Sequence, residues 1–239
     1  MIKLNEIYND DALVIMDKMI AEGIQVDLIL TDPPYNITSR GNAGDSGGMF
    51  KKDISKKGKV FEYNDVDVKV WGKKIYQVLK DTGHCYIMTN HVNLKEYLNV
   101  LTGVGFHFIK CLIWDKCNKI MGQFYMSQFE YILFFRKGAG LKINNNGSSD
   151  ILRVPNIKTK VWKGDNLHDT EKPVNLMRIL IENSTKKNET VFDAFMGIGA
   201  TCIASVLSKR NYIGVEIDEK YFNIAKKRIE MAKNEHELF

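Results

Sequence analysis

The spacing of apolar residues predicts alternating strands and helices. Residues 26–30 form an almost wholly apolar run that stops at a Pro-Pro step, as is typical of a parallel strand buried on both faces. Residues 219–233 place their apolar side chains at helical spacing. The same patterns predict strands at 4–8, 84–89, 106–114, 129–136, 190–193 and 212–216, and helices at 13–20, 68–79, 93–101, 173–183 and 200–209.

This alternation predicts an α/β protein with a mostly parallel sheet. The strands at 106–114 and 129–136 are joined by a connection too short for a crossover helix, which predicts an antiparallel pair at one edge of the sheet. The 239 residues show no internal repeat and no linker, so we expect a single domain over 1–239.

Two basic segments lack this apolar pattern. Residues 36–64 carry six basic and three acidic residues, and 137–163, predicted to be an irregular insert, carry six basic and one acidic. The two segments together carry a net charge of +8 whereas the whole chain carries +5, so the rest of the chain is net negative and the excess positive charge lies in these segments. Such clusters favour a nucleic-acid partner, although solvated lysine-rich loops give the same pattern.

Composition limits the class of protein. With 44% hydrophobic and 26% charged residues, the chain is typical of folded proteins. The four cysteines form no CxxC pair, which predicts free thiols in a reducing compartment. Because no apolar run is long enough to span a membrane and the N-terminus does not resemble a signal peptide, we expect a cytoplasmic protein without a membrane partner. No cluster has metal-ligand spacing, so no metal is expected.

The segment 190–201 has the pattern of a cofactor site. An apolar strand ends at Asp193 and turns through Gly197 and Gly199 into a helix, whose N-terminus favours an anionic group. Glu216, at the end of the next strand, can accept hydrogen bonds from both hydroxyls of a ribose. Cys202 replaces the third glycine of a dinucleotide fingerprint, and only 23 residues follow Glu216, so upstream strands must complete a permuted sheet.

The tetrapeptide Asp32-Pro33-Pro34-Tyr35 follows the strand at 26–30 directly. In open parallel sheets, ligands bind at the carboxyl ends of the strands. A carboxylate and prolyl carbonyls on a stiff backbone, followed by an aromatic ring, are suited to holding a planar amino group. The tetrapeptide alone is also compatible with a simple turn, but its place after a buried strand favours a site.

These two motifs together resemble the S-adenosylmethionine-dependent amino-methyltransferases of DNA. The order of catalytic tetrapeptide, recognition segment and cofactor glycines resembles their β class, which includes many adenine-N6 enzymes. The resemblance spans nearly the whole chain and extends to residues 9–12, 168–173 and 212–216. It implies a permuted Rossmann-like methyltransferase fold, S-adenosylmethionine as cofactor and double-stranded DNA as substrate. It further implies a cognate restriction endonuclease as partner for many members, and either a monomer or a homodimer.

The resemblance also implies roles for individual residues. Asp32 and the carbonyl of Pro33 would accept the N–H groups of a flipped-out adenine, Pro34 would stiffen the backbone, and Tyr35 would stack on the base. Residues 137–167 would be a target-recognition insert and 36–64 a flexible loop beside the catalytic motif. The implied cofactor-binding residues are Asp11, Lys172, Asp193, Phe195, Gly197, Gly199, Thr201 and Glu216.

Within that set, the resemblance places Asp11 near the cofactor adenine, Glu216 on the ribose and Lys172 on the methionine carboxylate. The sequence departs from the family pattern at Ala194 and Asp169, where proline is common, and at Ala200, where threonine is common. These departures concern cofactor contacts and leave the catalytic tetrapeptide intact.

Several related chemistries compete. Cytosine-C5 methylation uses a cysteine after a proline, and none of the four cysteines here follows one. Cytosine-N4 methylation uses the same amine chemistry and stays open, although those relatives more often have serine at position 32. A catalytically silent nucleic-acid-binding subunit and methylation of RNA also stay open, whereas enzymes that methylate protein glutamine favour asparagine at position 32.

Overall fold

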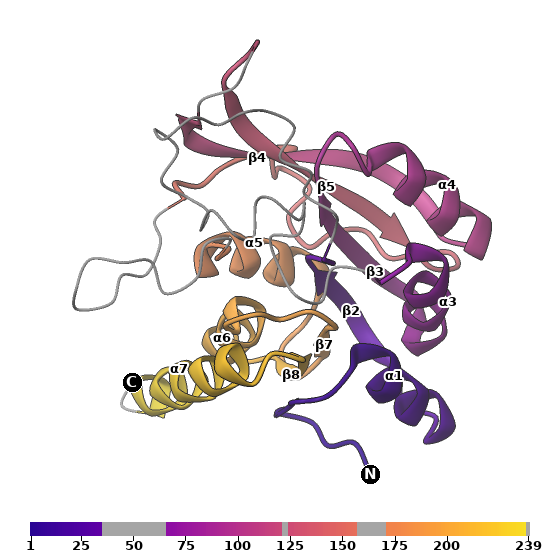
Figure 1. The fold of residues 1–239 in the computed structure, drawn as a ribbon, viewed down its shortest axis with the longest axis vertical. Coiled ribbons are helices and arrows are strands. Elements are labelled where there is room, and N and C mark those ends of the chain that lie inside the picture. The colour runs from indigo at the N-terminus through magenta and orange to yellow at the C-terminus, as the bar shows by residue number, and fades with distance from the viewer. Residues whose placement is uncertain (35–65, 121–123, 157–170, 238–239) are drawn as a thin grey trace, which may run out of the picture.

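The computed structural model describes residues 1–34, 66–120, 124–156 and 171–237. One eight-stranded sheet runs through the molecule with helices packed against it (Figure 1). The elements in chain order are β1 (Glu6–Tyr8), α1 (Ala12–Ala21), β2 (Val26–Thr31), α3 (Val68–Val78), β3 (Leu79–Thr89), α4 (Leu94–Val104), β4 (His107–Ile120), β5 (Ser127–Arg136), β6 (Ile151–Arg153), α5 (Val174–Ser184), β7 (Thr190–Asp193), α6 (Ala200–Leu207), β8 (Asn211–Val215) and α7 (Glu219–Glu237).

The strand order confirms the predicted permutation. The sheet runs β1-β8-β7-β2-β3-β5-β4-β6, so the two C-terminal strands lie between the two N-terminal ones. In Figure 1 the indigo β2 and the orange β7 lie side by side although most of the chain separates them. Of the described strands, only β5 runs against the others, because it pairs antiparallel with both β3 and β4.

The predicted antiparallel pair is confirmed, but it does not form the edge of the sheet. The short strand β6 pairs in parallel with β4, with Ile113 opposite Ile151, and takes the edge position. The segment predicted to be wholly irregular therefore contains a strand. Three residues are too few to show an alternating pattern, and β6 is specified by the backbone of β4, as in the 2.8 Å bond from the Ile113 amide to the Asp150 carbonyl.

Two hydrophobic layers cover the faces of the sheet. Val26 and Ile29 of β2 pack with residues of α1, α3 and α4, whereas Leu28 and Leu30 pack with residues of α5 and α6. All four side chains are fully buried, which confirms that this strand is covered on both faces. Along the part of the chain that the structure describes, no helix has the length and apolar character needed to cross a membrane.

Helix α6 and strand β8 approach closely at Gly214. A Cβ added there would lie 2.7 Å from the Sγ atom of Cys202 and 2.6 Å from the Sδ atom of Met196. Cys202 stands where the dinucleotide fingerprint has a glycine that serves this packing. In this protein the glycine is at position 214 of the strand, and its missing side chain leaves room for Cys202 on the helix.

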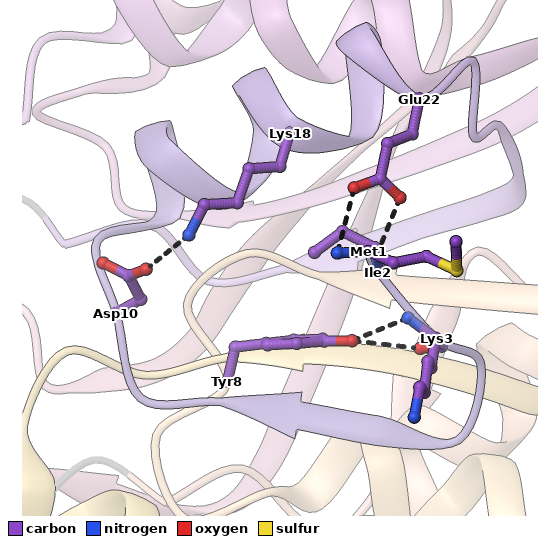
Figure 2. A network of polar contacts seen from close by, with 7 residues as sticks. All are labelled: Met1, Ile2, Lys3, Tyr8, Asp10, Lys18 and Glu22. Carbon is purple, nitrogen blue, oxygen red and sulfur yellow. Dashed lines mark hydrogen bonds and ion pairs between the residues drawn. The ribbon is translucent and has the colours of Figure 1, made fainter.

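A polar network fixes the N-terminal residues beside α1 (Figure 2). The backbone amide of Ile2 donates to Glu22 at 2.8 Å, and the amide of Lys3 donates to the hydroxyl of Tyr8 at 2.7 Å. Lys18 of α1 forms a 3.1 Å ion pair with Asp10, which precedes the N-terminus of the helix, and this contact lowers the pKa of Asp10. The network holds the short strand β1 in place, and with it the Asp11 that follows.

Candidate active site

The two predicted motifs meet at the carboxyl ends of β2 and β7. These strands are paired in parallel, with Ile29 opposite Phe192. At their ends, the hydroxyl of Thr31 donates a buried hydrogen bond of 2.7 Å to Oδ1 of Asp193. Asp32 directly follows Thr31, so the candidate catalytic carboxylate lies next to the candidate cofactor turn.

Asp32 has two oxygens in different surroundings. Its Oδ2 accepts a hydrogen bond from the ammonium of Lys172 and forms an ion pair with it. Its Oδ1 is buried and has no hydrogen-bond partner among the described residues, although the side chain as a whole is 24% exposed. Burial raises the pKa of Asp32, and Lys172 opposes that effect. A buried acceptor without a partner is costly, which favours a donor group arriving from a ligand.

The structure places Lys172 beside the catalytic motif. The resemblance implied a contact with the methionine carboxylate of the cofactor, but here the Lys172 ammonium contacts Asp32 and lies 3.7 Å from Oε2 of Glu130. Pro33 and Pro34 follow Asp32 as the sequence requires, and Pro33 is buried. Tyr35 lies outside the described residues, as do the matched residues 168–170.

Glu130 and Lys116 are members of this site that the sequence analysis missed. Oε1 of Glu130 forms a 2.6 Å ion pair with Lys116, whose side chain is only 9% exposed. Burial disfavours the ionised form of Glu130, but the two neighbouring lysines outweigh it and lower the pKa. The available signal was a single carboxylate in the strand at 129–136, which is apolar or aromatic at every other position except Arg136.

The glycine turn closes on Glu216. The amide of Gly197 donates to Oε2 of Glu216 at 2.9 Å, and the amide of Asp218 donates to Oε1 at 2.8 Å. Gly197 and Gly199 both have positive φ angles, of 54° and 83°. Burial raises the pKa of Glu216. Glu216, the residue predicted to bind a ribose, therefore contacts the glycine turn that is predicted to bind the same cofactor.

Asp193 organises the same turn from inside. Besides Thr31, its carboxylate accepts a 3.1 Å hydrogen bond from the amide of Phe195 and one from the side chain of Thr201. Burial raises the pKa of Asp193 to about 6 against these hydrogen bonds. The structure thus brings Asp193, Phe195 and Thr201 together, with the carboxylate of Asp193 bonded to the protein itself.

Asp11 lies at the neighbouring end of β1. Its Oδ1 caps α1 by accepting a 2.7 Å hydrogen bond from the amide of Leu13. The side-chain amide of Asn9 donates to the carbonyl oxygens of Glu216 and Ile217, at 2.9 and 3.1 Å. These bonds hold the carboxyl ends of β1 and β8 together. Asp11 and Glu216 therefore follow the carboxyl ends of parallel strands, on the same side of the sheet as Asp193 and Asp32.

The basic insert divides into different parts. Lys137 is buried, and its ammonium donates to the carbonyl oxygens of Leu79 and Tyr76 at 2.7 and 3.0 Å, so this lysine supports the fold and is not free for a phosphate. Lys142 and Arg153 are exposed. The loop at 36–64 and the remainder of the insert, 157–167, lie outside the described residues.

Comparisons with known proteins agree with this arrangement. A family model for N6- and N4-methyltransferases, described as DNA methylase, matches residues 26–227. The Type II methyltransferase M2.MboI of Moraxella bovis is 30% identical over 227 residues, which cover 85% of this chain and 80% of that protein. The crystal structure of the M1.HpyAVI–SAM complex is 25% identical with a TM-score of 0.70, covering 93% of this chain and 98% of that one.

A second solved structure shares the fold at lower identity. The PvuII DNA methyltransferase, which is cytosine-N4-specific, is 15% identical with a TM-score of 0.69, and the match covers 98% of this chain and 92% of that one. A cytosine-N4-specific enzyme therefore shares this fold. The family match covers most of the chain and includes both motifs of the site, and this protein belongs to the DNA methylase family.

Proposed function

We propose that this protein transfers a methyl group from S-adenosylmethionine to the exocyclic N6 amine of adenine in double-stranded DNA. The observation that carries the proposal is Asp32, whose Oδ1 is buried and finds no partner in the described part of the chain, while its Oδ2 is held by Lys172. The amine lone pair of adenine is delocalised into the ring. A carboxylate that accepts an amino N–H draws that hydrogen out of the plane and makes the nitrogen a better nucleophile.

The residues at the carboxyl ends of β1, β7 and β8 fit the proposed cofactor. Glu216 offers a half-buried carboxylate for ribose hydroxyls, and the turn at Gly197 and Gly199 leads into the N-terminus of α6, which favours a carboxylate. Asp11 lies at the adjacent strand end. When bound, S-adenosylmethionine supplies an activated methyl group on a sulfonium. The protein's own part is to align donor and amine in a site that excludes water.

Adenine is favoured over cytosine by the residue at position 32. The sequence has aspartate there, whereas cytosine-N4 enzymes more often have serine. The fold itself does not separate the two, because the cytosine-N4-specific PvuII enzyme shares it. Methylation of cytosine N4 is therefore the alternative that the experiment must address.

The decisive experiment incubates unmethylated genomic DNA with the full chain and S-adenosylmethionine, identifies the modified nucleoside by mass and maps its sites. N6-methyladenine at a defined sequence would support the proposal, and N4-methylcytosine would replace it with the alternative. Cofactor binding without transfer to any DNA or RNA would support a silent subunit. Asp32→Ala should abolish transfer while changing cofactor affinity less than about threefold.

We further propose that both basic segments contact DNA phosphates. The exposed Lys142 and Arg153 support this role for the insert, and the charge of 36–64 supports it for the loop. Neutralising Lys56, Lys57 and Lys59 together should reduce the salt dependence of DNA binding, and an unchanged slope would remove this loop from the interface. The Type II designation of M2.MboI supports a companion restriction endonuclease. We propose a monomer or a homodimer.

A further inference from the structure

Four charged side chains form a continuous row beside the proposed catalytic motif. In order they are Asp32, Lys172, Glu130 and Lys116, with ion pairs between each neighbouring two. The two lysine side chains are only 9% and 10% exposed, and that of Glu130 is 20% exposed. The row contains two carboxylates and two ammonium groups, so its charge balances where water is largely excluded.

Glu130 lies between the two lysines of this row because of its strand register. Tyr131 of β5 pairs with Thr89, the last residue of β3, and Glu130 pairs with Trp114 of β4. Glu130 therefore lies just beyond the carboxyl end of β3, on the same side of the sheet as Asp32, which follows the carboxyl end of β2. Its two oxygens point to two lysines, with Oε1 at 2.6 Å from Lys116 and Oε2 at 3.7 Å from Lys172.

A lysine needs more than one partner to be held in one place. Its ammonium is a compact charge on a flexible four-carbon stem. The Lys172 ammonium lies between Asp32 and Glu130, so a displacement from one carboxylate brings it toward the other. Lys116 anchors the far oxygen of Glu130 and lies 5.4 Å from the ring centre of Trp114, which limits the movement of Glu130 in turn.

We propose that Glu130 is a positioning residue for methyl transfer: it keeps the Lys172 ammonium on one oxygen of Asp32, so that the other oxygen is available to the target amine. This inference rests on the proposed role of Asp32. Nothing in the arrangement requires Glu130 to touch the substrate or the cofactor, because it acts through Lys172.

The first test is a double-mutant cycle on single-turnover methyl transfer, using Glu130→Gln and Lys172→Met in the full chain. Glu130→Gln alone should slow transfer at least tenfold and leave the dissociation constant of S-adenosylmethionine within twofold. In the Lys172→Met background, the same change should alter the rate less than twofold. If the two effects multiply instead, Glu130 does not act through Lys172 and the inference is wrong.

A matched variant separates positioning from charge balance. Glu130→Gln leaves Lys116 without its carboxylate, so a loss of rate could follow from that uncompensated charge. The pair Glu130→Gln with Lys116→Met removes both charges and leaves Asp32 and Lys172 unsubstituted. We expect transfer to stay slow in this double variant. Recovery to the wild-type rate would show that Glu130 only neutralises Lys116.

The pH profile gives a third readout that a structural role would not move. The charged groups facing Asp32 are Lys172, Glu130, Lys116 and Asp193. Removing the charge of Glu130 alone would lower the pKa of Asp32, because one nearby negative charge disappears. Loss of Lys172 from Asp32 would raise that pKa. We therefore expect Glu130→Gln to move the acid limb of the transfer rate to higher pH, and a move to lower pH or no move would contradict positioning.

The outcomes distinguish this inference from the proposed function. Asp32→Ala is measured in the same assay. If the wild-type chain transfers no methyl group, the proposed function fails. If Asp32→Ala still transfers methyl groups, the proposed role of Asp32 fails and the inference fails with it. If Asp32→Ala is inactive while the effects of Glu130→Gln and Lys172→Met multiply, only the inference fails.

Discussion

Thr31 and Asp193 join the two halves of the site through one buried hydrogen bond of 2.7 Å. Thr31 is the last residue of β2 and Asp193 the last of β7, and both side chains are almost fully buried. The residue after Thr31 is the candidate catalytic Asp32, and the residues after Asp193 form the glycine turn. The bond therefore fixes the catalytic carboxylate relative to the proposed cofactor site.

Replacing Thr31 with valine should weaken both stability and transfer. Valine keeps the shape and removes the hydroxyl, so Asp193 loses one of its hydrogen bonds in a buried site. The free energy of unfolding should fall by about 1–3 kcal/mol, and the affinity for S-adenosylmethionine should fall because the turn loses a fixed point. Thr31→Ser is the matched control, since it keeps the donor. Equal behaviour of the two variants, by denaturant titration and cofactor binding, would show that the hydroxyl does not matter.

Asp193 should make stability depend on pH. Its pKa in the folded chain is raised to about 6 from 3.8. A carboxyl group with a raised pKa stabilises the fold fully below its unfolded pKa, and this contribution is lost as the pH rises through the folded pKa. The difference between these two pKa values corresponds to roughly 3 kcal/mol in the free energy of unfolding.

Asp193→Asn should remove that dependence, because the amide cannot ionise and its oxygen can still accept from Thr31 and Phe195. The measurement compares the free energy of unfolding of variant and wild type between pH 4 and pH 7. Relative to the variant, the wild type should lose stability across this window. Parallel curves would mean that Asp193 ionises in the fold as easily as in the unfolded chain.

Local patterns predicted the frame of the site. The end of each strand, the Pro-Pro step and the two glycines are encoded by neighbouring residues. The local pattern therefore suffices to place Asp32, Asp193 and Glu216 at the carboxyl ends of parallel strands. The buried faces of β2 and the antiparallel pairing of β4 with β5 follow from the same kind of pattern, and the structure confirms them.

Contacts between distant segments could not be predicted in this way. Lys172 is 140 residues from Asp32 in the chain, so their ion pair depends on the tertiary fold and not on a local pattern. Glu130 and Lys116 become neighbours only through the pairing of β4 with β5 and their side-chain directions. The strand β6 was missed for a related reason, because its pairing with β4 specifies it more than its own three residues do.

Gly199→Ala should damage the cofactor turn. Gly199 has a φ angle of 83°, which an alanine adopts only with strain, and an added Cβ would lie 3.1 Å from the Cβ of Ala225 in α7. We expect a loss of about 1–3 kcal/mol in the free energy of unfolding and weaker binding of S-adenosylmethionine.

Gly103→Ala is the matched control for this substitution. Gly103 lies in α4, and an added Cβ there would meet no atom within 4 Å. Alanine favours helix, so this variant should gain about 0.5–1 kcal/mol. Both variants are compared by thermal unfolding and cofactor titration. If Gly199→Ala matched the control, neither the backbone conformation nor the contact with α7 would constrain the turn.

Arg228 ties the glycine turn to the segment that carries Lys172. Its Nη1 donates to the carbonyl of Ile198, between the two glycines, at 2.9 Å, and its Nη2 pairs with Glu171 at 2.6 Å. The Glu171 side chain is only 4% exposed, so this ion pair is largely withdrawn from solvent. One guanidinium in α7 thus spans the proposed cofactor site and the residue next to Lys172.

Arg228→Met should therefore weaken cofactor binding and slow methyl transfer together, with a loss of stability on the order of 2 kcal/mol because a buried carboxylate loses its arginine. Arg178→Met is the control, since its pair with Glu182 lies on the surface of α5 and is worth about 0.3–0.5 kcal/mol. The dissociation constant of S-adenosylmethionine and the single-turnover rate are measured for both. A variant at position 228 that lost stability but kept both values would reduce Arg228 to a purely structural role, because the turn and Lys172 would then hold their positions without it.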